Sequence, residues 1–334
     1  EISFWDGVLD TGSIANLAAG AKANAITASA AAGASGSWAT GKLDTYSLDF
    51  DSTSPSDYVD LPFGATSGSS NGQSGSVAAW IWADIIPSPS GYPVIFGASK
   101  NTSTTDQMRL GISTNGSYLN NLQFASRIGS TWGPFVYATS GGTNNDGKVV
   151  VGEWTHVVWT SDGTTTSMYL NGTSSTIVSA GAGPTGRWFG DMGLASGYNV
   201  RLGGIMYGGV SFYPFDGKMD EVGVWSEVMN LGGVQALYND GVGAKANTVS
   251  SSYLVSYYDM EDGVGTTLTD RTANGYDGTL TNMSGGTAGI ASASLTAYLD
   301  MECDGPGSNN VLDLSGNSVS GTLINTDTGS CGAG

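Results

Sequence analysis

The sequence predicts an all-β protein that folds as an antiparallel sandwich or barrel. Short runs in which large apolar residues alternate with polar ones recur along much of the chain, and turn-forming pairs separate them. Helix signals are nearly absent, and 52 of the 334 residues are Gly, which is a poor helix former. Many short strands with tight turns between them are typical of antiparallel sheets.

The predicted strands begin at residue 46. Their ranges are 46–50, 58–61, 77–82, 94–96, 108–112, 122–124, 154–159, 167–170 and 200–202. In the first of them, Tyr46, Leu48 and Phe50 fall on one face because side chains alternate along a strand. Asn-Gly or Asp-Gly pairs, which suit the positive φ angles of hairpin turns, lie at 115–116, 146–147, 162–163, 171–172 and 216–217.

One short helix is predicted after Trp225. Apolar residues recur there at roughly helical spacing, at Val228, Leu231, Val234, Leu237 and Tyr238. Gly232 and Gly233 within this run lower its helix propensity. We therefore expect a single helix at the end of the strand-rich region.

Two segments of the sequence occur twice. Residues 1–24 resemble residues 221–247, and residues 254–261 resemble residues 295–302. Because internal repeats define the modular unit, we expect a modular array that is a piece of a longer repetitive protein. The predicted parts are a closing segment of a preceding unit at 1–24, an Ala/Gly/Ser linker at 25–43, a complete unit at 44–247, and the openings of a second and a third unit at 248–292 and 293–334.

Charge and cysteine content restrict the partners and the location. The chain has 29 acidic and 11 basic residues and no cluster of Lys or Arg, so we expect neither nucleic acid nor membrane insertion. No apolar run approaches the roughly 18 residues of a membrane-spanning helix. The two cysteines, Cys303 and Cys331, bracket one short segment and predict a disulfide in an oxidising, extracellular setting. The alternative is two unrelated thiols.

Five motifs, in order along residues 44–247, resemble the laminin-G-like, concanavalin A-like jelly-roll family. They lie at 46–51 with 57–59, at 76–81, at 152–159, at 168–172 and at 215–225. The resemblance implies a jelly-roll β-sandwich. Segment 256–263, with Asp270 and residues 274–280, is similar to the usual start of such a unit. Proteins of this pattern resemble surface adhesins and the fibre or decoration proteins of bacterial viruses, which implies an extracellular, cell-surface or virion-surface location.

Some jelly-roll relatives are glycoside hydrolases, which place two catalytic carboxylates on one strand. A retaining pair of carboxyl groups lies about 5–5.5 Å apart, which two acids two residues apart on one strand provide. The expected Glu-x-Asp-x-Glu pattern is absent, and the nearest string, Asp259-Met260-Glu261, lies in an opening segment. The single histidine, His156, lies inside a predicted strand and adjoins no nucleophile motif. We therefore expect no catalytic residues, with a laminarinase-type glycoside hydrolase as the alternative.

Glycan binding is the activity that the resemblance implies. Sugars present CH faces to aromatic rings and hydroxyl groups to Arg and amide side chains, so the candidates are Arg127, Trp132 and Trp188. The alternative is that these side chains fill the core. Related jelly rolls hold a structural calcium ion near the closing strand, which implies Asp220 and Asp51 as ligands. Otherwise Asp51 is a turn residue and Asp220 caps a strand end.

The leading hypothesis is a non-catalytic extracellular or virion-surface module for adhesion, glycan binding or surface decoration. Its partners would be a glycan, a cell or virion surface, or copies of itself. The second hypothesis is a purely structural subunit of a virion or filament, in which neighbouring chains complete the partial units. Unfinished sheets leave strand edges that invite pairing.

Overall fold

The structure is a computed structural model, and it divides into two compact units, residues 36–286 and residues 1–35 with 287–334. Each unit is described by itself. The described residues are 2–5, 38–53, 55–62, 74–86, 92–100, 106–129, 131–140, 146–192, 198–207, 209–283, 295–303, 310–313 and 321–322.

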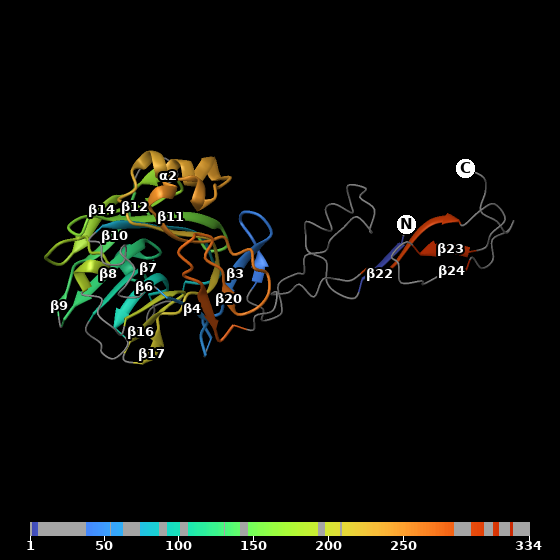
Figure 1. The fold of residues 1–334 in the computed structure, drawn as a ribbon, viewed down its shortest axis with the longest axis horizontal. Helices are drawn as coiled ribbons and strands as arrows, with labels where there is room; N and C mark the ends of the chain where they lie inside the picture. Colours follow the sequence, from blue (N-terminus) through green and yellow to red (C-terminus); the bar gives the residue numbers. More distant parts are fainter. Residues whose placement is uncertain are drawn as a thin grey trace. The chain divides into compact units, whose positions relative to one another are not determined.

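Residues 36–286 form a sandwich of two antiparallel sheets (Figure 1). The first has the strand order β13-β12-β11-β5-β18-β3-β2, and β19 also pairs with β18. Its strands are β2 (Trp38–Thr40), β3 (Tyr46–Phe50), β5 (Gly75–Ala83), β11 (Trp154–Ser161), β12 (Thr166–Leu170), β13 (Thr173–Ser174), β18 (Gly217–Trp225) and β19 (Leu254–Tyr258). The prediction of an all-β antiparallel sandwich is confirmed.

The second sheet has the order β14-β10-β8-β7-β6-β15-β4-β21-β20, and β9 also pairs with β8. Its strands are β4 (Tyr58–Leu61), β6 (Val94–Lys100), β7 (Gln107–Ile112), β8 (Leu122–Ile128), β9 (Thr131–Trp132), β10 (Phe135–Thr139), β14 (Thr176–Ala180), β15 (Tyr198–Leu202), β20 (Thr267–Leu268) and β21 (Gly278–Thr281). A separate hairpin consists of β16 (Ile205–Tyr207) and β17 (Val210–Phe212).

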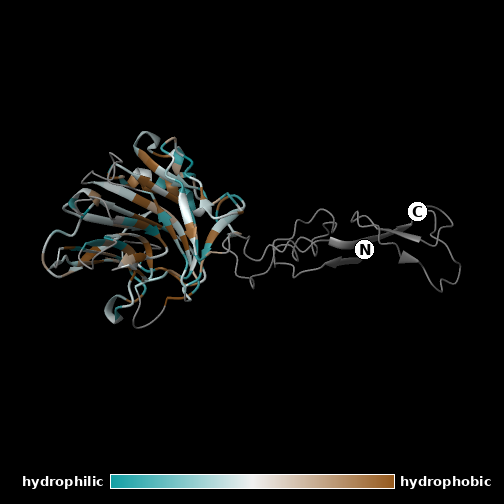
Figure 2. Ribbon diagram, turned by 60° about the horizontal axis from the view of Figure 1, so that its bottom comes forward, coloured by the Kyte–Doolittle hydropathy of each residue, from teal (hydrophilic) through white to brown (hydrophobic). Residues whose placement is uncertain are grey.

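The core lies between the two sheets, and alternation along each strand decides which side chains enter it. In β7, Met108 and Leu110 belong to the main hydrophobic cluster. Phe124 of β8 stacks on Trp159 of β11, with the ring centroids 4.6 Å apart, so this pair joins the two sheets. Hydrophobic and hydrophilic residues alternate along many of these strands in Figure 2. Each fully buried large apolar side chain contributes about 1.5–3 kcal/mol to folding.

The predicted helix is confirmed as α2 (Leu231–Tyr238). Its N-cap is Asn230, whose Oδ1 accepts a hydrogen bond from the Gly233 N–H at 3.0 Å. Val234 and Leu237 are buried in a second hydrophobic cluster that includes residues of β5 and β11. The helix therefore covers the outer face of the first sheet (Figure 1).

Residues 248–292 were predicted to open another unit, and the structure pairs their strands with the jelly roll itself. β19 pairs with β18 in the first sheet, and β21 pairs with β4 in the second. Both sheets thus receive a strand from this segment. The repeat in the sequence identifies the segment as a unit opening, but pairing depends on which strand edges are available in the fold.

The remaining described strands belong to residues 1–35 with 287–334. β1 (Ile2–Trp5) pairs with β22 (Leu295–Cys303), β22 pairs with β23 (Asn310–Asp313), and β23 pairs with β24 (Gly321–Thr322). All three pairings are antiparallel. The predicted disulfide lies outside the described residues, because Cys331 is not among them.

Candidate ligand-binding site

Polar side chains gather on the outward face of the second sheet. In β7, Met108 and Leu110 point into the core. Gln107 and Arg109, which alternate with them along the strand, therefore point outward. Gln107 is directly opposite Arg127 of β8, and Arg109 is opposite Ala125. Because residues directly opposite each other share a face, Gln107, Arg109 and Arg127 form one outward patch.

The guanidinium of Arg109 lies among three aromatic rings. Its Cζ is 4.5 Å from the ring centroid of Tyr213, 5.0 Å from that of Tyr92 and 5.3 Å from that of Trp132. Arg109 is only 4% exposed. Cation–π attraction stabilises a guanidinium in such surroundings and holds the rings in place.

Trp132 is the exposed member of this group, with 37% of its surface accessible. It lies on β9, opposite Arg127 of β8, whose Cζ is 5.4 Å from the indole centroid. Its ring stacks on Phe135 at a centroid distance of 5.4 Å. The indole is therefore held in a fixed position at the protein surface. We call Tyr92, Arg109, Arg127, Trp132 and Tyr213 the arginine–aromatic face.

Several buried polar atoms next to this face form no hydrogen bond within the described part of the chain. They are Nη1 of Arg109, Oε1 of Gln107, and both Oε1 and Nε2 of Gln123. A buried polar group without a partner costs about 1–3 kcal/mol. These groups therefore offer donors and acceptors that a polar ligand would satisfy.

The hairpin of β16 and β17 limits the face on one side. Gly97 of β6 lies opposite Arg109 and so points outward, and a Cβ at Gly97 would lie 2.2 Å from Cγ2 of Ile205. The hairpin thus rests on the sheet above Gly97. Tyr213 follows directly after β17, so the hairpin positions this ring beside Arg109.

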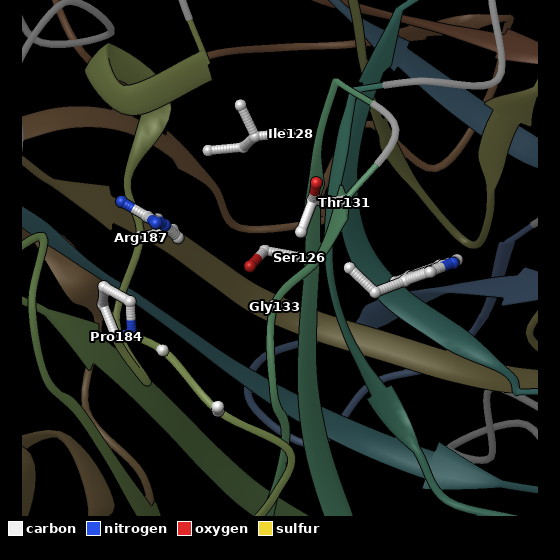
Figure 3. A pocket seen from close by; sticks show the side chains of 9 residues that line it. Ser126, Ile128, Thr131, Gly133, Pro184 and Arg187 are labelled. Atoms are coloured by element: carbon white, nitrogen blue, oxygen red, sulfur yellow. The ribbon is translucent and has the colours of Figure 1, made fainter.

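A cavity of about 300 Å³ adjoins Trp132. Ser126 and Thr131 line it from the β8–β9 hairpin, and Pro184 and Arg187 line it from residues 182–187 (Figure 3). Arg187 also forms a 4.0 Å ion pair with Asp191. Ser126 lies opposite the core residue Met108, so the cavity opens on the other side of the hairpin from the arginine–aromatic face. Its hydroxyl groups and the guanidinium of Arg187 suit a small hydroxylated ligand.

Trp188, the third candidate from the sequence, lies elsewhere. It is 1% exposed, and its ring centroid is 5.1 Å from those of Trp159 and Phe189 in the core. This corrects the expectation that it binds a glycan, because a buried ring cannot stack on a sugar. The neighbouring Arg187 lines the cavity instead.

Arg109, Tyr92 and Tyr213 are not among the site residues expected from the sequence. Alternation in 107–112 identifies Arg109 as an outward residue, and this signal was available. The two tyrosines gave no such signal, because they lie 17 or more residues from Arg109 in the sequence. Only the tertiary structure places their rings beside the guanidinium.

Asp220 and Asp51, the predicted calcium ligands, are not brought together. Asp220 is fully buried, its Oδ2 accepts hydrogen bonds from the Lys42 and Leu43 N–H groups, and its Oδ1 accepts from the Glu221 N–H. Burial raises the pKa of Asp220 to about 8. Both oxygens thus already accept hydrogen bonds from backbone amides, and these surroundings do not fit a cation.

Asp51 is an exposed turn residue, whose Oδ1 accepts from the Thr53 N–H at 2.7 Å. Phe50 pairs with Gly217, so Asp51 and Asp220 are four residues apart along the sheet, about 13 Å. Calcium ligands lie about 2.3–2.6 Å from the ion, so these two carboxylates cannot share one. Among the described residues, no group of three or more His, Cys, Asp or Glu could hold a metal ion.

The carboxylates of the Asp259-Met260-Glu261 string make contacts within the fold. Asp259 Oδ1 accepts from Arg271 Nε at 2.7 Å. Glu261 Oε1 accepts from the Thr45 and Tyr46 N–H groups at 3.0 and 2.6 Å. These contacts tie the segment after β19 to the start of β3.

His156 is buried and its ring centroid is 5.0 Å from that of Trp80. Burial lowers the pKa of His156 to about 3, so the imidazole is neutral at physiological pH. The part of the chain that the structure describes contains no helix that is long and apolar enough to cross a membrane.

The two-sheet jelly roll and its outward face define a concanavalin A-like β-sandwich. The chain belongs to the concanavalin A-like lectin/glucanases superfamily, whose family model matches residues 51–235. This confirms the resemblance inferred from the five sequence motifs. No curated protein matches the sequence.

Three solved structures illustrate the likeness in fold. One is a Bacteroides ovatus protein proposed to bind carbohydrate (20% identity, TM-score 0.46), which matches 72% of this chain over 61% of its own length. The CBM40 of the Ruminococcus gnavus IT-sialidase bound to α2,3-sialyllactose (14%, 0.41) matches 64% of this chain over 98% of its own. Tailspike protein 2 of the Escherichia coli O157:H7 bacteriophage CAB120 (15%, 0.45) matches 66% of this chain over 27% of its own.

Proposed function

We propose that this module binds glycans at the arginine–aromatic face. The observation that carries the proposal is the position of Trp132, which is exposed, held by Phe135 and flanked by the guanidinium groups of Arg109 and Arg127. An indole packs against the CH face of a sugar ring, and guanidinium groups donate hydrogen bonds to its hydroxyls.

Arg109 favours a glycan that carries a negative charge. Its guanidinium is buried and forms no ion pair within the described residues. A buried charge without a counter-charge is costly, and cation–π contacts offset only part of that cost. A carboxylate or sulfate group on the glycan would provide the counter-charge and would accept from Nη1 of Arg109.

The module acts without catalysis, outside the cell or on a virion surface, in adhesion or surface decoration. The family analogy of the sequence motifs supports this wider role. The contacts of Asp259 and Glu261 support the absence of catalysis at this string, because each carboxylate accepts hydrogen bonds from groups of the fold itself.

The test is a glycan array probed with the full chain, once in calcium and once with a chelator. We expect binding to a defined glycan class and a loss of at least tenfold on Trp132→Ala. Tyr253→Ala is the matched control, because Tyr253 is 51% exposed and lies in the short 3-10 helix just before β19 of the other sheet. Absence of binding in both conditions, or an equal loss in both variants, would contradict the proposal. Loss of binding in the chelator alone would restore calcium as a ligand.

A further inference from the structure

The pairing of β1 with β22 repeats the pairing of β18 with β19. By sequence, residues 2–5 correspond to 222–225 and residues 295–299 correspond to 254–258. In the jelly roll, Val222, Gly223, Val224 and Trp225 lie opposite Tyr258, Tyr257, Ser256 and Leu254. Ile2, Ser3, Phe4 and Trp5 lie opposite Leu299, Tyr298, Ala297 and Leu295, which are the corresponding residues. The register shift also falls at the same step, just before the Trp.

A second register is also repeated. Residues 310–313 and 321–322 correspond by sequence to residues 267–270 and 278–279. Thr267 and Leu268 of β20 lie opposite Thr279 and Gly278 of β21. Asn310 and Val311 of β23 lie opposite Thr322 and Gly321 of β24. A single slip of one residue would change every pair, so agreement in both pairings identifies the same structural element.

The two copies differ in their other neighbours. In the jelly roll, Gly223, Val224 and Trp225 of β18 lie opposite Ala78, Val77 and Ser76 of β5 on the second edge. β1 is an edge strand whose described partner is β22 alone. In the jelly roll the β20–β21 hairpin joins the second sheet through β4, whereas β23 pairs with β22. Among the described residues, the terminal copy therefore has the seam of a jelly roll without the strands that flank it.

We propose that β1 and β22 are the closing and opening strands of a second jelly roll, and that the segment of residues 36–286 is an insertion between these two strands in the sequence. The free edge of β1 then pairs with a strand equivalent to β5 (Gly75–Ala83). This strand belongs to the remaining strands of the second jelly roll, here called its body, which are not among residues 1–334. The hairpin of β23 and β24 receives a strand of the β4 type from the same body. This inference does not depend on glycan binding.

Backbone chemistry explains why a β5-type strand is the occupant. An edge strand presents a row of unpaired N–H and C=O groups that a neighbouring strand satisfies. Which strand fits is decided by the repeat, because the residues that correspond to Ser3, Phe4 and Trp5 pair with Ala78, Val77 and Ser76, respectively, in the complete copy. An open four-stranded sheet needs a packed face for independent stability, so the proposed jelly-roll body would also stabilise it.

The first experiment adds the proposed jelly-roll body to the chain as a fusion. A copy of residues 36–220 is fused ahead of Glu1, so that Asp220-Glu1 reproduces the Asp220-Glu221 junction inside β18. We expect two protease-resistant units, one containing residues 295–322. The control is the same fusion ended at residue 286, which lacks β22 and should show one resistant unit. The same number of resistant units in both fusions would overturn the proposal.

The second experiment tests the register in the chain itself, with Cys303 and Cys331 replaced by Ser. The variant Ser3→Cys with Tyr298→Cys places two thiols at a directly paired position, about 4.5–5.5 Å apart at Cα, within reach of a disulfide. The control Ser3→Cys with Glu302→Cys is four residues out of register. We expect an intramolecular disulfide in the first variant alone. Equal cross-linking in the two, none in either, or cross-links between chains would contradict a seam closed within one chain.

Discussion

The carboxylate of Asp220 on β18 accepts a hydrogen bond at 2.9 Å from the backbone N–H of Leu43, which lies 177 residues earlier in the sequence. The adjacent Lys42 N–H donates to the same oxygen. These contacts fix the turn that leads from β2 to β3 against β18 of the first sheet. One buried carboxylate thus holds the beginning of the jelly roll to its end.

Replacing this carboxylate should destabilise the fold. Asp220→Ala would leave three backbone N–H groups without their acceptor, of which Lys42 and Leu43 donate to one oxygen and Glu221 to the other. Each buried unsatisfied donor costs about 1–3 kcal/mol, so we expect a loss of several kcal/mol in the free energy of unfolding. Urea denaturation measures it. The control Asp51→Ala, at an exposed turn, should cost about 1 kcal/mol or less.

Acid should destabilise the protein through His156. Burial lowers its pKa in the folded protein to about 3, below the unfolded value of about 6.5, so the unfolded state binds the proton first. The stability that the neutral imidazole contributes is therefore present above pH 6.5 and is lost as the pH falls toward 3. Urea midpoints at pH 7 and pH 4.5 should differ less in His156→Phe, which cannot titrate, than in the parent. An unchanged difference would show that other groups cause it.

The pH dependence of stability that Asp220 causes is opposite to that of His156. Burial raises its pKa to about 8 in the folded state, so its contribution is complete below the unfolded value near 3.8 and is lost as the pH rises toward 8. We expect Asp220→Asn to flatten the decline in melting temperature between pH 5 and pH 8. A decline as steep as in the parent protein would mean that the carboxylate stays ionised when buried.

Arg109 and Arg187 distinguish the arginine–aromatic face from the cavity. Arg109→Gln removes the buried guanidinium, and a lost charge-assisted hydrogen bond is worth about 1.5–3 kcal/mol, so binding of acidic glycans should weaken at least tenfold. Arg187→Gln, at the cavity, should leave it within threefold. Titration of each variant with one acidic glycan and its neutral parent measures both. A larger loss of binding in Arg187→Gln than in Arg109→Gln would place the ligand in the cavity. An equal loss for the acidic and the neutral glycan in Arg109→Gln would contradict the charge preference but not the binding site.

Trp188 and Trp132 should separate stability from binding. Trp188→Ala removes a ring that packs against Trp159 and Phe189 in the core, which should cost about 3–5 kcal/mol in the free energy of unfolding. Trp132→Ala, at the surface, should cost about 1 kcal/mol or less but should weaken glycan binding. Urea denaturation and glycan titration on both variants give the comparison. A folded Trp188→Ala protein with weakened binding would return Trp188 to the site.

Local patterns in the sequence determined the elements of this fold. Alternation between 107 and 112 identified a strand with one apolar face, and Asn171-Gly172 identified a hairpin turn, whose φ angles are 47° and 75°. Five short motifs in order identified the superfamily. Each of these signals lies within a few residues, because side-chain direction and turn geometry depend on the local backbone.

The tertiary structure alone decided which elements meet. The sequence marked Trp132 and Trp188 equally as ligand-binding residues, yet one lies at the surface and the other in the core. It marked 254–261 and 295–302 as two copies of one opening, and only the structure shows that each pairs with its own copy of the closing strand, the first with β18 and the second with β1. Pairing and burial depend on contacts between residues distant in sequence, and a local pattern carries no information on which distant strand is free to pair.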